Sequence, residues 1–146
     1  MNNLEDLEKK INSELTTKIN NTEIKHKQLY IEIDKDDLID VTLFLKTNQE
    51  TKFRQLIDVT VVDFPENTQR FKMVYLFLSH EFNQRIILTY SINENEVIPS
   101  LTSIFPAANW MERSSLITKN LHKKLKKFNE TKKSKNRCTN STGYLF

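Results

Sequence analysis

The chain has 146 residues and a formal net charge of +3, which is enough for one domain with a single core and too little for two. No apolar run approaches the roughly 20 residues that a membrane-spanning helix needs. One cysteine, Cys138, and three widely spaced histidines exclude a disulfide framework and any multi-cysteine zinc or iron–sulfur site. The polar, acidic start of the chain indicates neither a secretory signal nor a transit peptide.

Charge is distributed unevenly along the chain. Residues 114–146 hold nine Lys and Arg residues against one acid, Glu130, a net charge of +8, so residues 1–113 carry −5. A basic segment after an acidic body marks a composition boundary. We therefore predict a domain over residues 1–113 and a Lys/Asn-rich tail over residues 114–146, which is expected to be disordered.

The first 50 residues predict two helices and one strand. Apolar residues three and four positions apart over residues 4–19 indicate an amphipathic helix. Residues 22–33 follow, and the alternation at their end predicts a single strand. A second helix is predicted over residues 34–48, with an apolar face formed by Leu38, Val41, Phe44 and Leu45.

Three strands are predicted next, over residues 53–62, 70–79 and 84–92, with short Asn- and Asp-containing turns between them. Such spacing is typical of an antiparallel meander. The middle strand is so apolar from Met73 to Leu78 that it is expected to be buried on both faces. In the first strand the residues expected to share one face are Phe53, Ile57, Val59 and Val61.

A last helix is predicted after Pro106, which suits the first turn of a helix. Together these elements predict an α+β fold with a four-stranded mixed sheet that contains an antiparallel meander. The helices are expected to pack on one face of the sheet.

The domain carries no pattern typical of a catalytic or cofactor site. Asp58 and Asp63 are an odd number of strand positions apart, so they are predicted on opposite faces rather than as an acid–base pair. His80, in a turn beside Glu81, is interpreted as a surface histidine. The only glycine is Gly143, so neither a P-loop nor a Rossmann fingerprint can be built. We predict no catalytic, cofactor-binding or metal-binding residue, and a stand-alone enzyme is disfavoured.

Two segments leave alternatives open. Trp110 either fills the core from an amphipathic helix or anchors an interface, where Trp and Arg are enriched. The lysine clusters of the tail suit nucleic acid or an anionic membrane surface. A small basic-tailed protein that binds nucleic acid or a membrane surface is therefore the alternative hypothesis for function.

Residues 53–113 resemble the C subunit of NADH:quinone oxidoreductase, called NADH dehydrogenase subunit 9 in mitochondria. The resemblance rests on FRQLIDVTVVDFP, then QRFKMVYLFLS, then NQRIILTYSINENEVIPSLTSIFPAANWMER, in that order. Residues 1–52 fit the family only as a helix–strand–helix pattern. After Arg113 the family continues with Glu and an acidic, aromatic run, whereas this chain continues with Ser114, Ser115 and Leu116. This departure indicates translation past an exon boundary or a frameshift, or a split gene.

The resemblance implies a cofactor-free structural and assembly subunit in the peripheral arm of respiratory complex I, which as a whole transfers electrons from NADH to ubiquinone. Its expected partners are other peripheral-arm subunits, above all the large quinone-site subunit, with no nucleic acid and with membrane association only through the complex. The expected location is the matrix side of the mitochondrial inner membrane, or the cytoplasmic membrane face in a bacterium. The residues predicted to form interfaces are Asp58, Asp63, Arg70, Tyr75, Trp110, Glu112 and Arg113.

Overall fold

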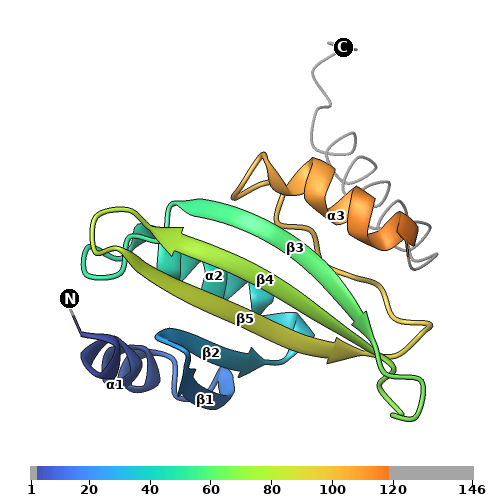
Figure 1. Cartoon of the computed structure of the whole chain (residues 1–146), viewed down its shortest axis with the longest axis horizontal. Coiled ribbons are helices and arrows are strands. Elements are labelled where there is room, and N and C mark those ends of the chain that lie inside the picture. The colour runs from blue at the N-terminus through green and yellow to red at the C-terminus, as the bar shows by residue number, and fades with distance from the viewer. Residues whose placement is uncertain (1–2, 119–146) are drawn as a thin grey trace, which may run out of the picture.

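A computed structural model describes residues 3–118 (Figure 1). The predicted C-terminal tail therefore lies almost wholly outside the described residues. In chain order the elements are α1 (Leu4–Glu14), β1 (Ile19–Lys25), β2 (Gln28–Ile33), a 3-10 turn η1 (Lys35–Asp37), α2 (Leu38–Thr47), β3 (Gln55–Asp63), β4 (Phe71–Ser79), β5 (Gln84–Ile92) and α3 (Ala108–Thr118).

The strands form one five-stranded sheet in the order β1-β2-β5-β4-β3. The predicted α+β class, mixed sheet and antiparallel meander are confirmed. Strand β2 pairs with β5 in parallel, and β4 pairs with both β3 and β5 in antiparallel orientation. The prediction of four strands is wrong, because residues 19–33 form a hairpin rather than one strand. Its two-residue turn, His26 and Lys27, has φ values of 50° and 61°. Such turns usually carry Asn-Gly, and without that signal the hairpin was not predicted.

A β-bulge in β3 changes which side chains point inward. The register with β4 shifts between Leu56 and Asp58, so Ile57 is an extra residue in the strand. Leu56 is consequently buried while Ile57 is partly exposed, and the prediction that Ile57 shares the face of Phe53 and Val59 is wrong. A prediction from alternating inward and outward side chains fails across a bulge, because the inserted residue reverses which side chains point inward.

Strand β4 is buried on one face only. Its odd-numbered residues, such as Tyr75 and Phe77, are buried, whereas the even-numbered ones are partly exposed. The prediction that both faces are buried is therefore wrong, since no helix among residues 3–118 covers the second face. We call this second face the outer face; on β2 to β5 its residues are Gln28, Tyr30, Glu32, Asp58, Thr60, Val62, Lys72, Val74, Leu76, Leu78, Arg85, Ile87, Thr89 and Ser91.

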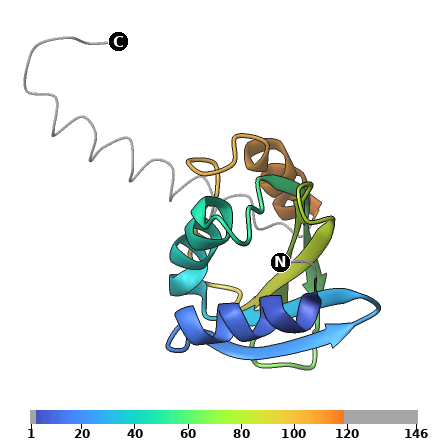
Figure 2. The ribbon, with the colours of Figure 1, turned by 90° about the vertical axis from the view of Figure 1, so that its left-hand side faces the viewer.

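Helices α1 and α2 cover the inner face and enclose the core. In Figure 2, α1 lies against β1 and β2 while α2 lies opposite β4 and β5. The third helix, α3, runs along the edge strand β3 instead (Figure 1), so packing on one face describes only two of the three described α-helices. The buried apolar residues that these two helices contribute are Leu7, Ile11, Leu38, Val41 and Leu45.

Helix α1 ends at Glu14, five residues before the predicted end. The hydroxyl of Ser13 donates to the carbonyl of Lys10 (2.8 Å), and that of Thr16 donates to the carbonyl of Asn12 (2.6 Å). Such side-chain bonds to the backbone compete with continued helix. Ile19 then opens β1. Ile19 follows Leu15 at the four-residue spacing of the apolar face of α1, so the sequence pattern alone placed it in the helix.

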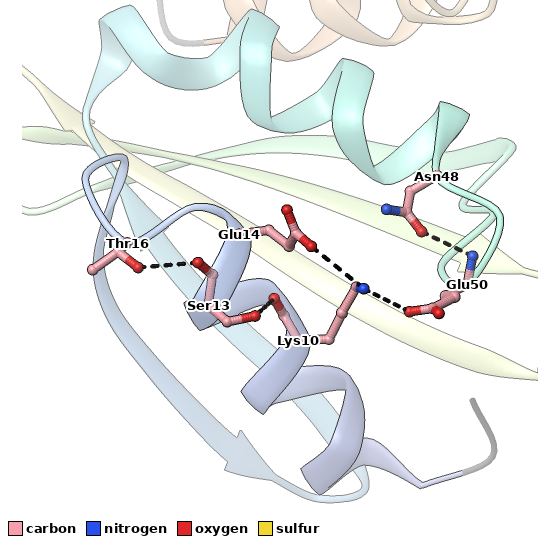
Figure 3. A network of polar contacts seen from close by, with 6 residues as sticks. All are labelled: Lys10, Ser13, Glu14, Thr16, Asn48 and Glu50. Carbon is pink, nitrogen blue, oxygen red and sulfur yellow. Dashed lines mark hydrogen bonds and ion pairs between the residues drawn. The ribbon is translucent and has the colours of Figure 1, made fainter.

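A polar network fastens α1 to the loop after α2 (Figure 3). The Lys10 ammonium lies 3.4 Å from a Glu14 carboxylate oxygen and 2.9 Å from one of Glu50. Asn48 holds Glu50 in place by accepting a hydrogen bond from its backbone N–H at 2.8 Å. The hydrogen bonds that Lys10 donates to the carboxylates of Glu50 and Glu14 raise its pKa. The network fixes the position of α1, although exposed ion pairs add little stability.

Candidate interaction site

Helix α3 is tied to the preceding loop by the buried carboxylate of Glu112, which is 0% exposed. Its Oε1 accepts from the backbone N–H of Leu101 at 2.8 Å, and its Oε2 accepts from the Ser100 hydroxyl at 2.7 Å. Hydrogen bonds to a charged acceptor are the stronger kind. Glu112 therefore holds α3 and the loop over residues 99–102 in one arrangement. This residue was singled out from the sequence, but its partners were not.

The same loop is anchored to the rest of the core. Phe105 packs against Phe77 with 5.5 Å between ring centroids, and the Lys46 ammonium lies 4.9 Å from the Phe105 centroid. Lys46 also donates to the carbonyl of Ile104 at 2.6 Å. Three residues after Glu112, on the same side of α3, the Ser115 hydroxyl donates to the carbonyl of Val59 on β3. These contacts make α3 a rigid covering of the β3 edge.

Trp110 projects from this fixed helix into solvent. Its side chain is 77% exposed, and Arg113, one turn further on, is also exposed. The interpretation of Trp110 as a residue that fills the core is therefore wrong. Met111, which packs against the core, takes that place beside buried Ala108. A large exposed aromatic on a rigid helix favours the interface alternative.

Tyr75, another predicted interface residue, lies in the core and is 0% exposed. Its ring stacks on that of Tyr90 with centroids 5.8 Å apart, and the two hydroxyls lie 3.1 Å apart. Burial raises the pKa of both phenols, and the charge of Glu112 raises them further. Tyr75 and Glu112 are both buried in this structure, and their place at an interface stays a prediction.

Asp63 and Arg70 form a bidentate pair across the turn between β3 and β4. Arg70 Nε and Nη2 donate to the two Asp63 carboxylate oxygens at 2.7 and 2.9 Å. The hydrogen bonds and charge of Asp63 raise the pKa of Arg70. Asp58 lies elsewhere, on the outer face, and accepts from the N–H of Val59 at 2.8 Å. The two aspartates thus face opposite sides of β3, as predicted.

The turn between β4 and β5 holds no arrangement typical of catalysis. The imidazole of His80 is hydrogen-bonded to the Gln55 side chain, and Glu81 pairs with Lys52 at 2.5 Å. The hydrogen bond from Lys52 lowers the pKa of Glu81. Over residues 3–118, no group of three His, Cys, Asp or Glu side chains is placed to hold a metal ion. In the same part of the chain, no helix is long and apolar enough to cross a membrane.

The described residues thus form a small α+β domain. Its buried Glu112 and its Asp63–Arg70 pair bond to other parts of the same domain, whereas Trp110 on α3 faces solvent. A family model described as "Respiratory-chain NADH dehydrogenase, 30 Kd subunit" matches residues 31–116. The chain belongs to this family. The match confirms the resemblance seen over residues 53–113 and extends it to α2 and the last three residues of β2.

Relatives with known names agree with the family. The chain is 44% identical over 92 residues to the C subunit of the NADH-quinone oxidoreductase of Dinoroseobacter shibae, covering 63% of this chain and 43% of that protein. It is 36% identical over 110 residues to the C subunit of the same enzyme from a Ruegeria species, covering 75% and 55%. The chain therefore spans about half the length of the curated relatives it matches.

A solved structure supports the fold. The chain resembles one chain of the membrane-bound sulfane sulfur reductase, an archaeal respiratory membrane complex, with a TM-score of 0.65 at 21% identity. That alignment covers 75% of this chain and 64% of the other.

Proposed function

We propose that this chain is a cofactor-free structural and assembly subunit in the peripheral arm of a respiratory NADH:quinone oxidoreductase. The whole complex would transfer electrons from NADH to quinone, and this subunit would pack against the large subunit that helps form the quinone site. Family membership and the names of the relatives support the assignment to the complex. The structural observation that carries the proposal is the 77% exposed Trp110 on a helix fixed to the core by Glu112.

The exposed Trp110 on α3 fits a protein interface better than a catalytic role. A Trp side chain buries a large area at small conformational cost, and such residues dominate the binding energy of many interfaces. Because Glu112 joins α3 to the preceding loop and Ser115 joins it to β3, little ordering of the helix is needed on binding. Arg113 is exposed on the same helix and would add a charged contact. Asp58, Asp63 and Arg70 remain predicted interface residues.

The proposed location follows from the complex. Membrane association would come through the other subunits. Named bacterial relatives support the cytoplasmic membrane face of a bacterium. The matrix side of the mitochondrial inner membrane remains a prediction from the sequence resemblance.

A Trp110→Ala variant of the full chain tests the proposal in the cells of origin, with blue-native gels of their membranes probed for this chain. The unmodified chain is expected in the peripheral arm of the complex. Removing a central aromatic anchor typically costs about 2 kcal/mol or more, or roughly 30-fold in affinity. We therefore expect most of the variant to leave the arm.

Leu43→Ala is the control, because Leu43 is a large apolar residue 47% exposed on α2 and is not among the predicted interface residues. It should enter the arm like the unmodified chain. Absence of the unmodified chain from the arm would refute the proposed function. Normal entry of Trp110→Ala would refute the role of α3 alone.

A further inference from the structure

The outer face of the sheet carries a continuous apolar row in its middle. Tyr30 on β2 is the register partner of Ile87 on β5, and Ile87 is the partner of Leu76 on β4. All three side chains are partly exposed. We call them the outer row. In Figure 1, α2 lies behind β4 and β5, and no helix of residues 3–118 crosses their front.

A groove on this face adds depth to the outer row. It has a volume of about 360 Å³. Its apolar lining comes from Tyr30, Ile31, Val74 and Ile87, and its polar lining from Asn21, Glu23, Lys25, His26, Glu32, Lys72 and Thr89. Thr89 forms a polar point in the floor, but its hydroxyl already donates to the carbonyl of Ile31 at 3.4 Å. The groove therefore combines apolar and charged walls, which suits a side chain of an amphipathic segment.

Charges surround the outer row in a defined pattern. Glu23 pairs with Lys25 at 2.8 Å, and Lys72 lies 3.9 Å from Glu32. Asp58, the register partner of Leu76 at the β3 end of the row, is exposed and forms no salt bridge within residues 3–118. A cation on a partner would complement this carboxylate.

The dimensions of the row select the kind of partner. It spans three adjacent strands, and neighbouring strands lie about 4.8 Å apart, so the row is about 10 Å wide. An α-helix with its side chains has a diameter of about 10–12 Å. One helix lying along β5 would therefore cover Tyr30, Ile87 and Leu76 at once. Its next side chains would reach the Asp58 side of the sheet.

From this arrangement we propose that the outer face binds an amphipathic helix of another protein. The helix places an apolar stripe on Tyr30, Ile87 and Leu76, with one side chain in the groove and a Lys or Arg opposite Asp58. This surface is separate from α3, which lies along the opposite edge of the sheet from β1. Glu23 and Glu32 are already paired with Lys25 and Lys72, so Asp58 is the carboxylate beside the row that is placed to pair with a cation of the partner.

Photo-cross-linking of the full chain in its own cells tests the inference. The variant Leu76→p-benzoylphenylalanine places the reactive group on the outer row, and the adduct is identified by peptide sequencing. Leu43→p-benzoylphenylalanine is the matched control, because Leu43 is 47% exposed on α2 and outside the outer face. We expect an adduct at Leu76 alone, to a segment of another protein with apolar residues three and four apart and a nearby Lys or Arg.

Charge reversal tests the electrostatic part. Asp58→Lys should lower the yield of the Leu76 adduct about three- to tenfold, whereas Asp36→Lys, at an exposed position on η1, should not change it. Both variants must keep the circular dichroism spectrum of the parent.

Several results would overturn the inference: an adduct to a second copy of this chain, to lipid or to RNA, a partner segment without a helical apolar stripe, no yield above the Leu43 control, or no effect of Asp58→Lys. The proposed function fails separately, when the unmodified chain is absent from the peripheral arm.

Discussion

Tyr75 and Tyr90 bring two ionisable hydroxyls into an apolar core, where their oxygens lie 3.1 Å apart. Burial raises both pKa values above the unfolded value of about 10. Their contribution to stability is therefore complete below pH about 10 and is lost as pH rises, because only the unfolded chain then releases these protons. Each phenol adds a slope of up to about 1.4 kcal/mol per pH unit.

The double variant Tyr75→Phe/Tyr90→Phe should remove most of this alkaline slope. It should cost little at pH 7, because both partners of one hydrogen bond are removed together. Urea unfolding between pH 8 and about 11.5 measures the slope. Tyr30→Phe, on the outer face, is the control and should keep it. An unchanged slope in the double variant would show that other groups cause alkaline unfolding.

Glu112 is a second single residue with a testable effect on stability, because it joins α3 to Ser100 and Leu101. Glu112→Ala would leave the Ser100 hydroxyl and the Leu101 N–H buried without their acceptor. We expect a loss of about 2–4 kcal/mol in the free energy of unfolding, measured by urea denaturation. Glu112→Gln, which keeps an acceptor oxygen, should lose less than half of that amount. Glu66→Ala, at an exposed position, should change little; an equal loss there would contradict the assignment.

At the scale of elements, the turn between β1 and β2 is a place where the backbone is strained. His26 and Lys27 both have positive φ, which costs non-glycine residues roughly 1–2 kcal/mol each. The variant His26→Asn/Lys27→Gly supplies the residues that such hairpin turns prefer. We expect it to raise the free energy of unfolding by about 1–2 kcal/mol, measured by urea denaturation. Lys25→Gly, within β1, should lower stability, and a gain there would contradict the turn assignment.

The elements also show how far the sequence could lead. The meander was predicted within two residues at every strand end, because alternation and turn residues are local signals. The β1–β2 hairpin was not, since its turn carries His and Lys in place of Asn and Gly. The inward position of Leu56 depends on a bulge that period-two alternation does not reveal.

The candidate site was predictable in its residues but not in their roles. Trp110, Glu112 and Arg113 lie within four consecutive residues, yet Glu112 is buried and the other two are exposed. Which side of α3 faces β3 depends on where the loop over residues 99–107 places the start of the helix. That is a tertiary property set by contacts such as Phe105 on Phe77 and Ser115 on Val59.

For the molecule as a whole, the end of the folded domain can be located by truncation. Sequence composition places the boundary at Arg113, whereas α3 continues to Thr118 and Ser115 bonds the edge strand β3. Among residues 3–115, whose side chains the structure describes, Ala108 is the last buried apolar residue of the core cluster. A chain that ends at Thr118 should therefore unfold in urea with a free energy within about 0.5 kcal/mol of the full chain.

A chain that ends at Arg113 should be less stable by about 1–2 kcal/mol, because it loses the Ser115 hydrogen bond and the last turn of α3. It also uncovers part of the β3 edge, and free strand edges promote association between molecules. Size-exclusion chromatography should therefore show more self-association for this chain than for the one ending at Thr118. Equal stability of the two truncated chains would place the domain boundary at Arg113, as composition predicts, and would leave Ser115 without a role in holding α3 on the sheet.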